Sequence, residues 1–187
     1  MLRTRTSKHR GIGNVITTLI ILIASVVLGA GVIFFGGSMF QTNTQSESIK
    51  VSNVHAWVNT NGTSVTAFAI QNTGSKAITV SSVSMRGLPV PTSNWYSCDP
   101  TDTTHCSTAN NINTDLTAFY NPSTGVTLAS GAVAMTSGSV SLTQGQATIV
   151  YVKAAGGLAP IDAGNTYSLQ VQSGQAIAVQ QVQVISK

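Results

Sequence analysis

The feature that most constrains this chain is a long stretch without charge, which runs from Gly11 to Ser46. Its predominantly apolar part extends from Val15 to Phe35. As a helix with a rise of 1.5 Å per residue, that part would be about 30 Å long, the thickness of a bilayer's hydrocarbon core. The sequence therefore predicts one N-terminal hydrophobic α-helix that is long enough to cross a membrane.

The charges are distributed unevenly around this stretch. The chain has 187 residues and a net charge of +4, and four cations lie in the first ten residues. The remainder holds five basic and five acidic side chains, so it is neutral. A basic cluster before an apolar helix keeps the N-terminus in the cytoplasm and sends the following residues outside. A nucleic-acid partner is excluded, because nucleic-acid binding needs a basic face on the folded domain. The four leader cations are Arg3, Arg5, Lys8 and Arg10.

Three interpretations of this N-terminus remain open from composition alone. A secretory signal peptide would be cleaved after its apolar region, with Leu28-Gly29-Ala30 as the candidate site. A signal anchor would keep the helix as a permanent span that tethers the exported body. A prepilin-type signal would be cleaved before the apolar region, so that the helix stays in the mature protein.

The residues Lys8-His9-Arg10-Gly11-Ile12-Gly13 carry a family resemblance. A basic cluster, a small residue and then an uninterrupted apolar helix resemble the class III signal of archaeal type IV pilins and archaellins. The resemblance implies that a prepilin peptidase cuts between Gly11 and Ile12, next to Arg10, with a cut after Gly13 as the alternative. The fifth mature position would be Ile16, where bacterial pilins usually carry Glu, so the archaeal branch is favoured.

Small residues on one face of the predicted helix indicate that another helix could pack against it. Ser25 and Gly29 lie four residues apart, on one face, and such spacing lets two helix backbones approach closely. Gly36 and Gly37 end the apolar run, and adjacent glycines weaken a helix. We therefore expect a kink or a melted turn there, before the polar residues 38–46. The resulting division is a leader over residues 1–11, a helical segment over 12–47 and an exported domain over 48–187.

The exported residues show a β pattern. Alternating segments are separated by turns such as Thr60-Asn61-Gly62 and Ser173-Gly174, and no helical periodicity appears after residue 48. Residues 65–70 are apolar on both faces, and a phase slip within 78–85 indicates a bulge. We predict an α+β chain whose domain is an antiparallel β-sandwich, and the resemblance implies an immunoglobulin-like one. Residues 94–121 are expected to form a long surface loop.

The two cysteines, Cys98 and Cys106, lie in this predicted loop. For an exported domain we expect a disulfide between them. The alternative is a metal site formed by two thiolates, His105 and a carboxylate. Zinc-binding cysteines usually stand two to four residues apart, however, and here seven residues intervene. We expect no metal and no cofactor.

Catalytic chemistry has few candidate residues. His55, beside Trp57, is interpreted as a packing group, and motifs for nucleophilic, metal or phosphate chemistry are missing from the sequence. We therefore predict that the protein is not an enzyme. Asn61-Gly62-Thr63 fits an N-glycosylation site on a turn, but Asn-Gly is also favoured in an unmodified hairpin.

The resemblance implies a structural function. The chain would be inserted in the cytoplasmic membrane, lose its leader to the peptidase, and join a cell-surface helical filament of identical subunits, such as an adhesive type IV pilus. An archaellin-type subunit of a motility filament is the first alternative. A signal-anchored binding module on the cell surface is the second.

Overall fold

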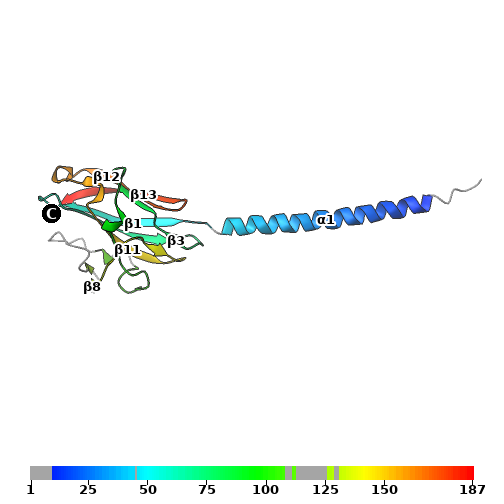
Figure 1. The fold of residues 1–187 in the computed structure, drawn as a ribbon, viewed down its shortest axis with the longest axis horizontal. Coiled ribbons are helices and arrows are strands. Elements are labelled where there is room, and N and C mark those ends of the chain that lie inside the picture. The colour runs from blue at the N-terminus through cyan, green and yellow to red at the C-terminus, as the bar shows by residue number, and fades with distance from the viewer. Residues whose placement is uncertain (1–9, 45, 108–110, 113–125, 129–130) are drawn as a thin grey trace, which may run out of the picture. The chain divides into compact units, whose positions relative to one another are not determined.

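The computed structural model describes residues 10–44, 46–107, 111–112, 126–128 and 131–187. The chain divides into two compact units, Met1–Thr44 and Gln45–Lys187, and each is described by itself. The first unit is one apolar helix and the second is a largely antiparallel β-domain (Figure 1), so the predicted α+β class is confirmed at this level.

Helix α1 extends without interruption over Arg10–Thr44. The expected kink at Gly36 and Gly37 is wrong. A glycine costs about 1 kcal/mol relative to alanine, but it keeps both backbone hydrogen-bonding groups. The Ser38 hydroxyl also donates to the Phe35 carbonyl oxygen at 3.0 Å, which spans the glycine pair. The helix ends at Thr44, three residues before the predicted boundary.

Residues 46–48 belong to the β-domain, because they are hydrogen-bonded to its turns. The Ser46 carbonyl accepts from Ser75 N, and the Ser48 carbonyl accepts from Gly74 N. The Glu47 carboxylate accepts from Gln175 N at 2.9 Å and pairs with Lys76 Nζ at 3.0 Å. These hydrogen bonds and the ion pair hold residues 46–48 against the rest of the domain. The strands and 3-10 turns that follow are β1(Ile49–Val58), β2(Ser64–Asn72), β3(Ile78–Thr79), β4(Ser82–Met85), β5(Leu88–Pro89), η1(Thr92–Asn94), β6(Trp95–Ser97), β7(Val126–Leu128), β8(Gly131–Val133), β9(Thr136–Ser137), β10(Ser141–Leu142), β11(Ala147–Lys153), η4(Ala155–Gly157), η5(Pro160–Asp162), β12(Thr166–Ser173) and β13(Ala176–Ser186).

The main sheet has the strand order β5-β4-β12-β13-β1-β2-β11-β6-β9. Its two halves meet where β1 and β13 pair over only three positions, Ala56–Val58 with Val184–Ser186, and this pairing is parallel. The other pairings in the sheet are antiparallel. The expectation of a purely antiparallel domain is therefore wrong at this one junction. Two small sheets, β10-β3 and β7-β8, complete the described strands.

The predicted turns connect antiparallel strands. β1 and β2 form a hairpin around Gly62, whose φ of +80° is a conformation that glycine adopts without strain. β12 and β13 form a second hairpin at Gly174, where φ is +55°. Both turns that were predicted from their glycines are therefore confirmed as the turns of β-hairpins.

The predicted bulge within residues 78–85 is wrong. β3 pairs with β10 in a small sheet, whereas β4 pairs with β12 in the main sheet. Ser81 lies between them and donates from N to the Gln172 carbonyl. The change in the apolar alternation within residues 78–85 therefore occurs where the chain passes from the small sheet to the main sheet.

Two hydrophobic clusters lie on opposite faces of β2. Phe68 and Ile70 belong to the first cluster, and Val65, Ala67 and Ala69 belong to the second. The first cluster takes buried residues from both halves of the main sheet, including β4, β12, β2 and β11. The apolar pattern on both faces of residues 65–70 is therefore explained by burial on both faces.

The second cluster corrects the prediction of a surface loop over 94–121. Trp95, 1% exposed, is a strand residue of the first cluster, and its Nε1 donates to the Val90 carbonyl. Cys98, Cys106 and Ile112 are buried against the opposite face of β2 and β11. Residues 108–110 and 113–121 lie outside the described part. The buried residues of the segment cover the second face of β2 with apolar surface, whereas Asp99, Thr101, Thr103 and Thr104 are exposed, so the loop prediction is wrong only for the buried residues.

Candidate functional site

The surface of α1 is the largest uncompensated apolar feature of the first unit. Its large side chains are exposed around the whole helix, from 53% at Ile16 to 82% at Phe34. Residues Gly13–Met39 are long and apolar enough to cross a membrane, by length and composition. An isolated apolar helix is stabilised only by an apolar environment, which is lipid or other helices.

The hydroxyl groups of Thr17, Thr18 and Ser25 do not interrupt this apolar surface. Thr17 Oγ1 donates to the Gly13 carbonyl at 2.8 Å, and Ser25 Oγ donates to the Leu22 carbonyl at 2.9 Å. Thr18 donates in the same way to the preceding turn. These bonds satisfy the three hydroxyl groups within the helix, so the hydroxyl groups need no partner outside it.

The predicted packing residues lie in open positions on α1. A Cβ added to Gly29, Gly36 or Gly37 would meet no atom within 4 Å. Gly37 also lines a shallow notch together with Ile33, Phe34 and Ser38. A neighbouring backbone could approach closely at these positions, so helix packing through Ser25, Gly29, Gly36 and Gly37 stays a prediction with suitable geometry.

The predicted cleavage residues Arg10, Gly11 and Ile12 form the first turn of α1. The other three leader cations fall within residues 1–9, which lie outside the described part. Cleavage after Gly11 stays a prediction.

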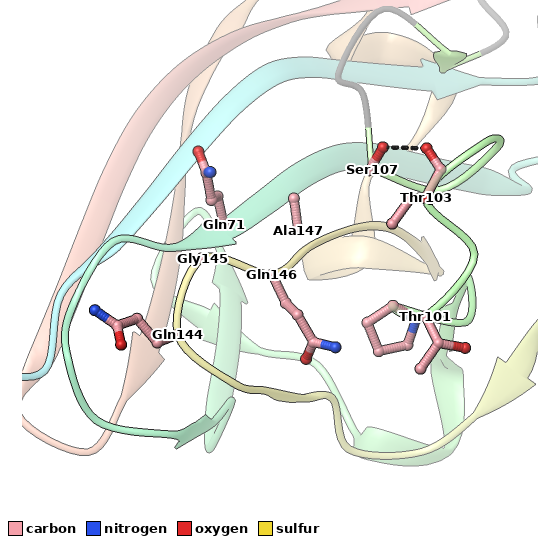
Figure 2. A pocket seen from close by; sticks show the side chains of 9 residues that line it. Gln71, Thr101, Thr103, Ser107, Gln144, Gly145, Gln146 and Ala147 are labelled. Atoms are coloured by element: carbon pink, nitrogen blue, oxygen red, sulfur yellow. Dashed lines mark hydrogen bonds between the residues drawn. The ribbon is translucent and has the colours of Figure 1, made fainter.

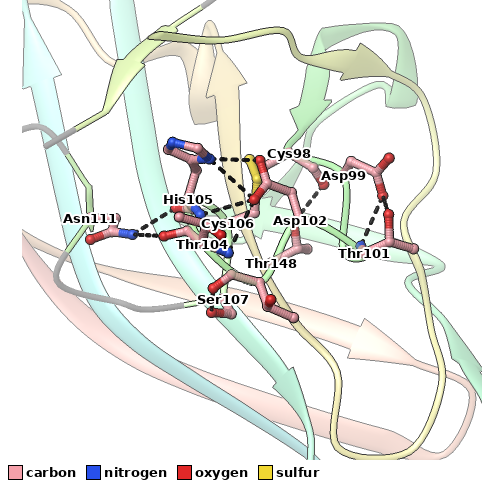
Figure 3. The surroundings of a disulfide bond; sticks show 11 residues. Cys98, Asp99, Thr101, Asp102, Thr104, His105, Cys106, Ser107, Asn111 and Thr148 are labelled. Carbon is pink, nitrogen blue, oxygen red and sulfur yellow. Dashed lines mark hydrogen bonds and ion pairs between the residues drawn. A yellow bond between two sulfur atoms is a disulfide. The ribbon is translucent and has the colours of Figure 1, made fainter. Parts of the chain in front are cut away.

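The disulfide between Cys98 and Cys106 closes a loop over the second cluster (Figure 3). The two Cα atoms are 5.6 Å apart, and the structure confirms the predicted pairing. The metal alternative is wrong, because both sulfur atoms are in the disulfide and no thiolate is available. Within the described residues, His, Cys, Asp and Glu side chains form no group of three or more that could hold a metal ion.

The acids of this loop bind its own backbone and side chains. Asp99 accepts from Thr101 N and Thr101 Oγ1, and Asp102 accepts from His105 N and from the His105 ring at 2.9 Å (Figure 3). The Thr101 hydroxyl holds the pKa of Asp99 below its ordinary value, and the His105 backbone N–H does the same for the pKa of Asp102. These contacts give the loop a fixed shape and leave its carboxylates occupied.

His55 is a packing residue, as expected. Its ring stacks on Trp57 at 5.6 Å between centroids, and its Nε2 lies 2.8 Å from Asn53 Oδ1. Burial lowers the pKa of His55, which favours the neutral ring. Asn61 lies exposed in the β1–β2 turn, so it is accessible, and its glycosylation stays a prediction.

Sequence analysis did not predict a half-buried ion pair, in which Asp162 is buried and Arg86 is partly exposed. Arg86 Nη1 lies 2.9 Å from Asp162 Oδ2, the Tyr167 hydroxyl donates to Asp162 Oδ1 at 2.6 Å, and Ala159 N donates to Oδ2. Arg86 also lies over the Tyr167 ring, with Cζ 4.7 Å from its centroid. Tyr167 is five residues from Asp162 in sequence, but Arg86 is 76 residues away, so no local spacing could reveal the ion pair.

This ion pair predicts acid sensitivity. The Tyr167 hydroxyl, followed by the Ala159 N–H and the Arg86 charge, lowers the pKa of Asp162 below its ordinary 3.8. A lowered folded-state pKa gives stability that is present above the unfolded value and is lost as pH falls through the folded value. We expect Tyr167→Phe to weaken the fall in unfolding free energy between about pH 5 and pH 2.

Urea denaturation at several pH values measures this effect. Tryptophan fluorescence reports the β-domain alone, because the chain's two tryptophans, Trp57 and Trp95, are both buried there. Tyr96→Phe, at a tyrosine outside the ion pair, is the control and should keep the wild-type pH dependence. Equal pH dependence in both variants would contradict the role assigned to Tyr167.

Neither a protein-family model nor a curated protein matches this chain. Among solved structures it is similar to a CARDB domain from Pyrococcus furiosus in complex with di-metal ions, at 11% identity and a TM-score of 0.32, covering 76% of this chain and 93% of that one. It is also similar to a β-glucosidase from Erythrobacter marinus, at 11% identity and a TM-score of 0.30. That match covers 74% of this chain, which spans 16% of the glucosidase. Likeness at these TM-scores assigns no function.

Proposed function

We propose that this chain is the structural subunit of an extracellular helical filament of the archaeal type IV pilin kind. The observation that carries the proposal is a charge-free helix, apolar and exposed on all sides, that directly follows the cleavage motif at Lys8–Ile12. Such a helix suits lipid before assembly and contact with its own copies afterwards. Head-to-tail contacts between identical subunits produce an open helical polymer.

Leader removal fits this transition. A cut after Gly11 discards Arg3, Arg5, Lys8 and Arg10, so the helix keeps only the new α-amino group at Ile12, and the next charged side chain is Glu47 at the start of the β-domain. Charged side chains are costly to carry into an apolar helix bundle. Cleavage would therefore permit α1 to leave lipid and pack against other copies of α1, with Ser25 and Gly29 at close approaches.

The β-domain would form the outer surface of the filament, as an immunoglobulin-like sandwich. The first hydrophobic cluster supports the sandwich, because buried residues from both halves of the main sheet meet in it. Val83 and Leu169 come from one half, and Phe68 and Val150 come from the other. A sheet whose halves share one core is folded back on itself, which is the arrangement of two packed layers. The exposed domain would then mediate adhesion.

The experiment is N-terminal sequencing of the chain from isolated surface filaments. We expect a mature start at Ile12 with α1 retained, and loss of both cleavage and filaments in Gly11→Val. Gly13→Val is the matched control, because it makes the same change two residues later, and it should be cleaved and assembled.

Other results would decide against the proposal. An intact Met1 in wild-type protein, with surface filaments that lack this chain, would indicate a membrane-tethered binding module. A mature start after Ala30 would indicate a secretory signal peptide. Loss of swimming and not of attachment after gene deletion would assign the filament to motility instead of adhesion.

A further inference from the structure

A groove in the β-domain lies between the disulfide loop and the turn that joins β10 to β11 (Figure 2). Its volume is about 650 Å³, within the range of sites that hold small molecules. The polar side chains that line it come from distant parts of the sequence: Gln71, Thr101, Thr103, Ser107, Gln144 and Gln146. We call this feature the amide–hydroxyl groove.

The chemistry of the lining is uniform. Three carboxamides and three hydroxyl groups face one space, and none of the residues that line it is ionisable. Carboxamides and hydroxyls each donate and accept hydrogen bonds. A charged ligand would lose hydration in this groove without gaining a counter-ion. The Thr101 and Ser107 hydroxyl groups donate within the loop and keep acceptor capacity, and Gln146 keeps its amide N–H groups, so the lining as a whole suits a neutral ligand that both donates and accepts.

Both walls of the groove are fixed before any ligand binds. On one side the Cys98–Cys106 disulfide closes the loop, and Thr148 Oγ1 donates to the Cys98 carbonyl at 2.6 Å. On the other side Gln146 Oε1 accepts from Thr143 N at 2.8 Å. With its oxygen held by the turn, Gln146 extends its amide toward Thr101 (Figure 2). Fixed donors and acceptors reduce the entropy lost on binding.

We propose that the amide–hydroxyl groove binds a neutral oligosaccharide. Adjacent sugar hydroxyls donate and accept together, which is the pattern that a carboxamide such as Gln71 satisfies with its two ends. The Pro100 ring and the Ala147 side chain, which also line the groove, offer apolar contact for the C–H face of a sugar. This site belongs to the β-domain alone and does not depend on filament assembly.

Binding is tested with the full chain in a zwitterionic detergent that contains no sugar. The probes are neutral hexasaccharides of glucose, mannose and galactose, with a hyaluronan hexamer and a neutral Ser/Gln peptide as comparators. Ligand-observed NMR measures the dissociation constants. We expect at least one neutral hexasaccharide to bind, and Gln71→Ala to weaken that binding at least tenfold.

Gln71→Ala is the decisive variant because Gln71 is exposed and its amide forms no bond that shapes the turn. Gln181→Ala, at an exposed glutamine on β13 outside the groove, is the matched control and should bind like wild type. Tryptophan fluorescence verifies that each variant is folded. The proposal is overturned if no neutral hexasaccharide binds, if Gln71→Ala binds as tightly as Gln181→Ala, or if only hyaluronan or the peptide binds. None of these results bears on cleavage at Gly11, so the two proposals fail separately.

Discussion

Replacing Ile149 by alanine is expected to lower the free energy of unfolding of the β-domain by about 2–5 kcal/mol. The same replacement at Ile177 should change it by no more than about 0.5 kcal/mol. Ile149 lies in β11, is 0% exposed and belongs to the second cluster, whereas Ile177 lies in β13 and is 56% exposed. Removing the buried methyl and methylene groups loses their transfer energy and leaves a cavity, and neither loss occurs at the exposed site.

This comparison tests whether the disulfide loop builds a core. Urea denaturation of the full chain in detergent, followed by tryptophan fluorescence, gives the three free energies needed. The third variant is Ile112→Ala, which follows the disulfide loop in sequence and packs in the same second cluster, where the side chain is 3% exposed. Ile112→Ala should lower the free energy of unfolding by at least about 2 kcal/mol. If Ile149→Ala and Ile112→Ala were both as mild as Ile177→Ala, the second face of the sheet would not be a packed core.

Replacing Gly156 by alanine is expected to cost about 2–4 kcal/mol, and replacing its neighbour Gly157 only about 1 kcal/mol. Both glycines have left-handed backbone angles, with φ of +59° and +62°. A Cβ at Gly156 would lie 2.5 Å from the carbonyl oxygen of Met85 and 2.8 Å from its Cβ. A Cβ at Gly157 would meet no atom within 4 Å. The backbone cost is shared, so the difference between the two variants isolates the clash.

Met85 cannot move aside to relieve this clash. It is 0% exposed, and β4 holds it in register with Leu169 of β12. The same denaturation experiment on both variants gives the difference in unfolding free energy. Equal destabilisation would show that η4 shifts away from β4 without cost, and the tight contact assigned to Gly156 would then be wrong.

Local patterns predicted those features that depend on neighbours in sequence. The run from Val15 to Phe35 predicted α1, because a helix is defined by hydrogen bonds within one segment. Glycine at positions 62 and 174 predicted hairpin turns, because positive φ is a property of single residues. The pairing of Cys98 with Cys106 followed from their number and from the prediction that the domain is exported.

Other features could not be read locally. Two glycines suggested a break at residues 36–37, yet the backbone hydrogen bonds and the Ser38–Phe35 bond carry the helix through it. The prolines and polar residues after Asn94 suggested a loop, yet Trp95 is a core residue. At residues 36–37 hydrogen bonds within the helix outweighed the tendency of the two glycines, whereas at Trp95 contacts with distant strands outweighed the local composition.

By itself, the sequence determined the division into a basic N-terminal segment, an uncharged helix and a neutral β-domain, because charge and apolar periodicity are properties of consecutive residues. Only the tertiary structure decided which strands meet at the parallel β1–β13 junction, which segment covers the second face of β2, and which groups surround Asp162. Those contacts join residues far apart in the chain, and a pairing between distant segments leaves no periodic trace in either one. The amide–hydroxyl groove has the same origin, since Gln71, Thr101 and Gln146 share a site only after the domain has folded.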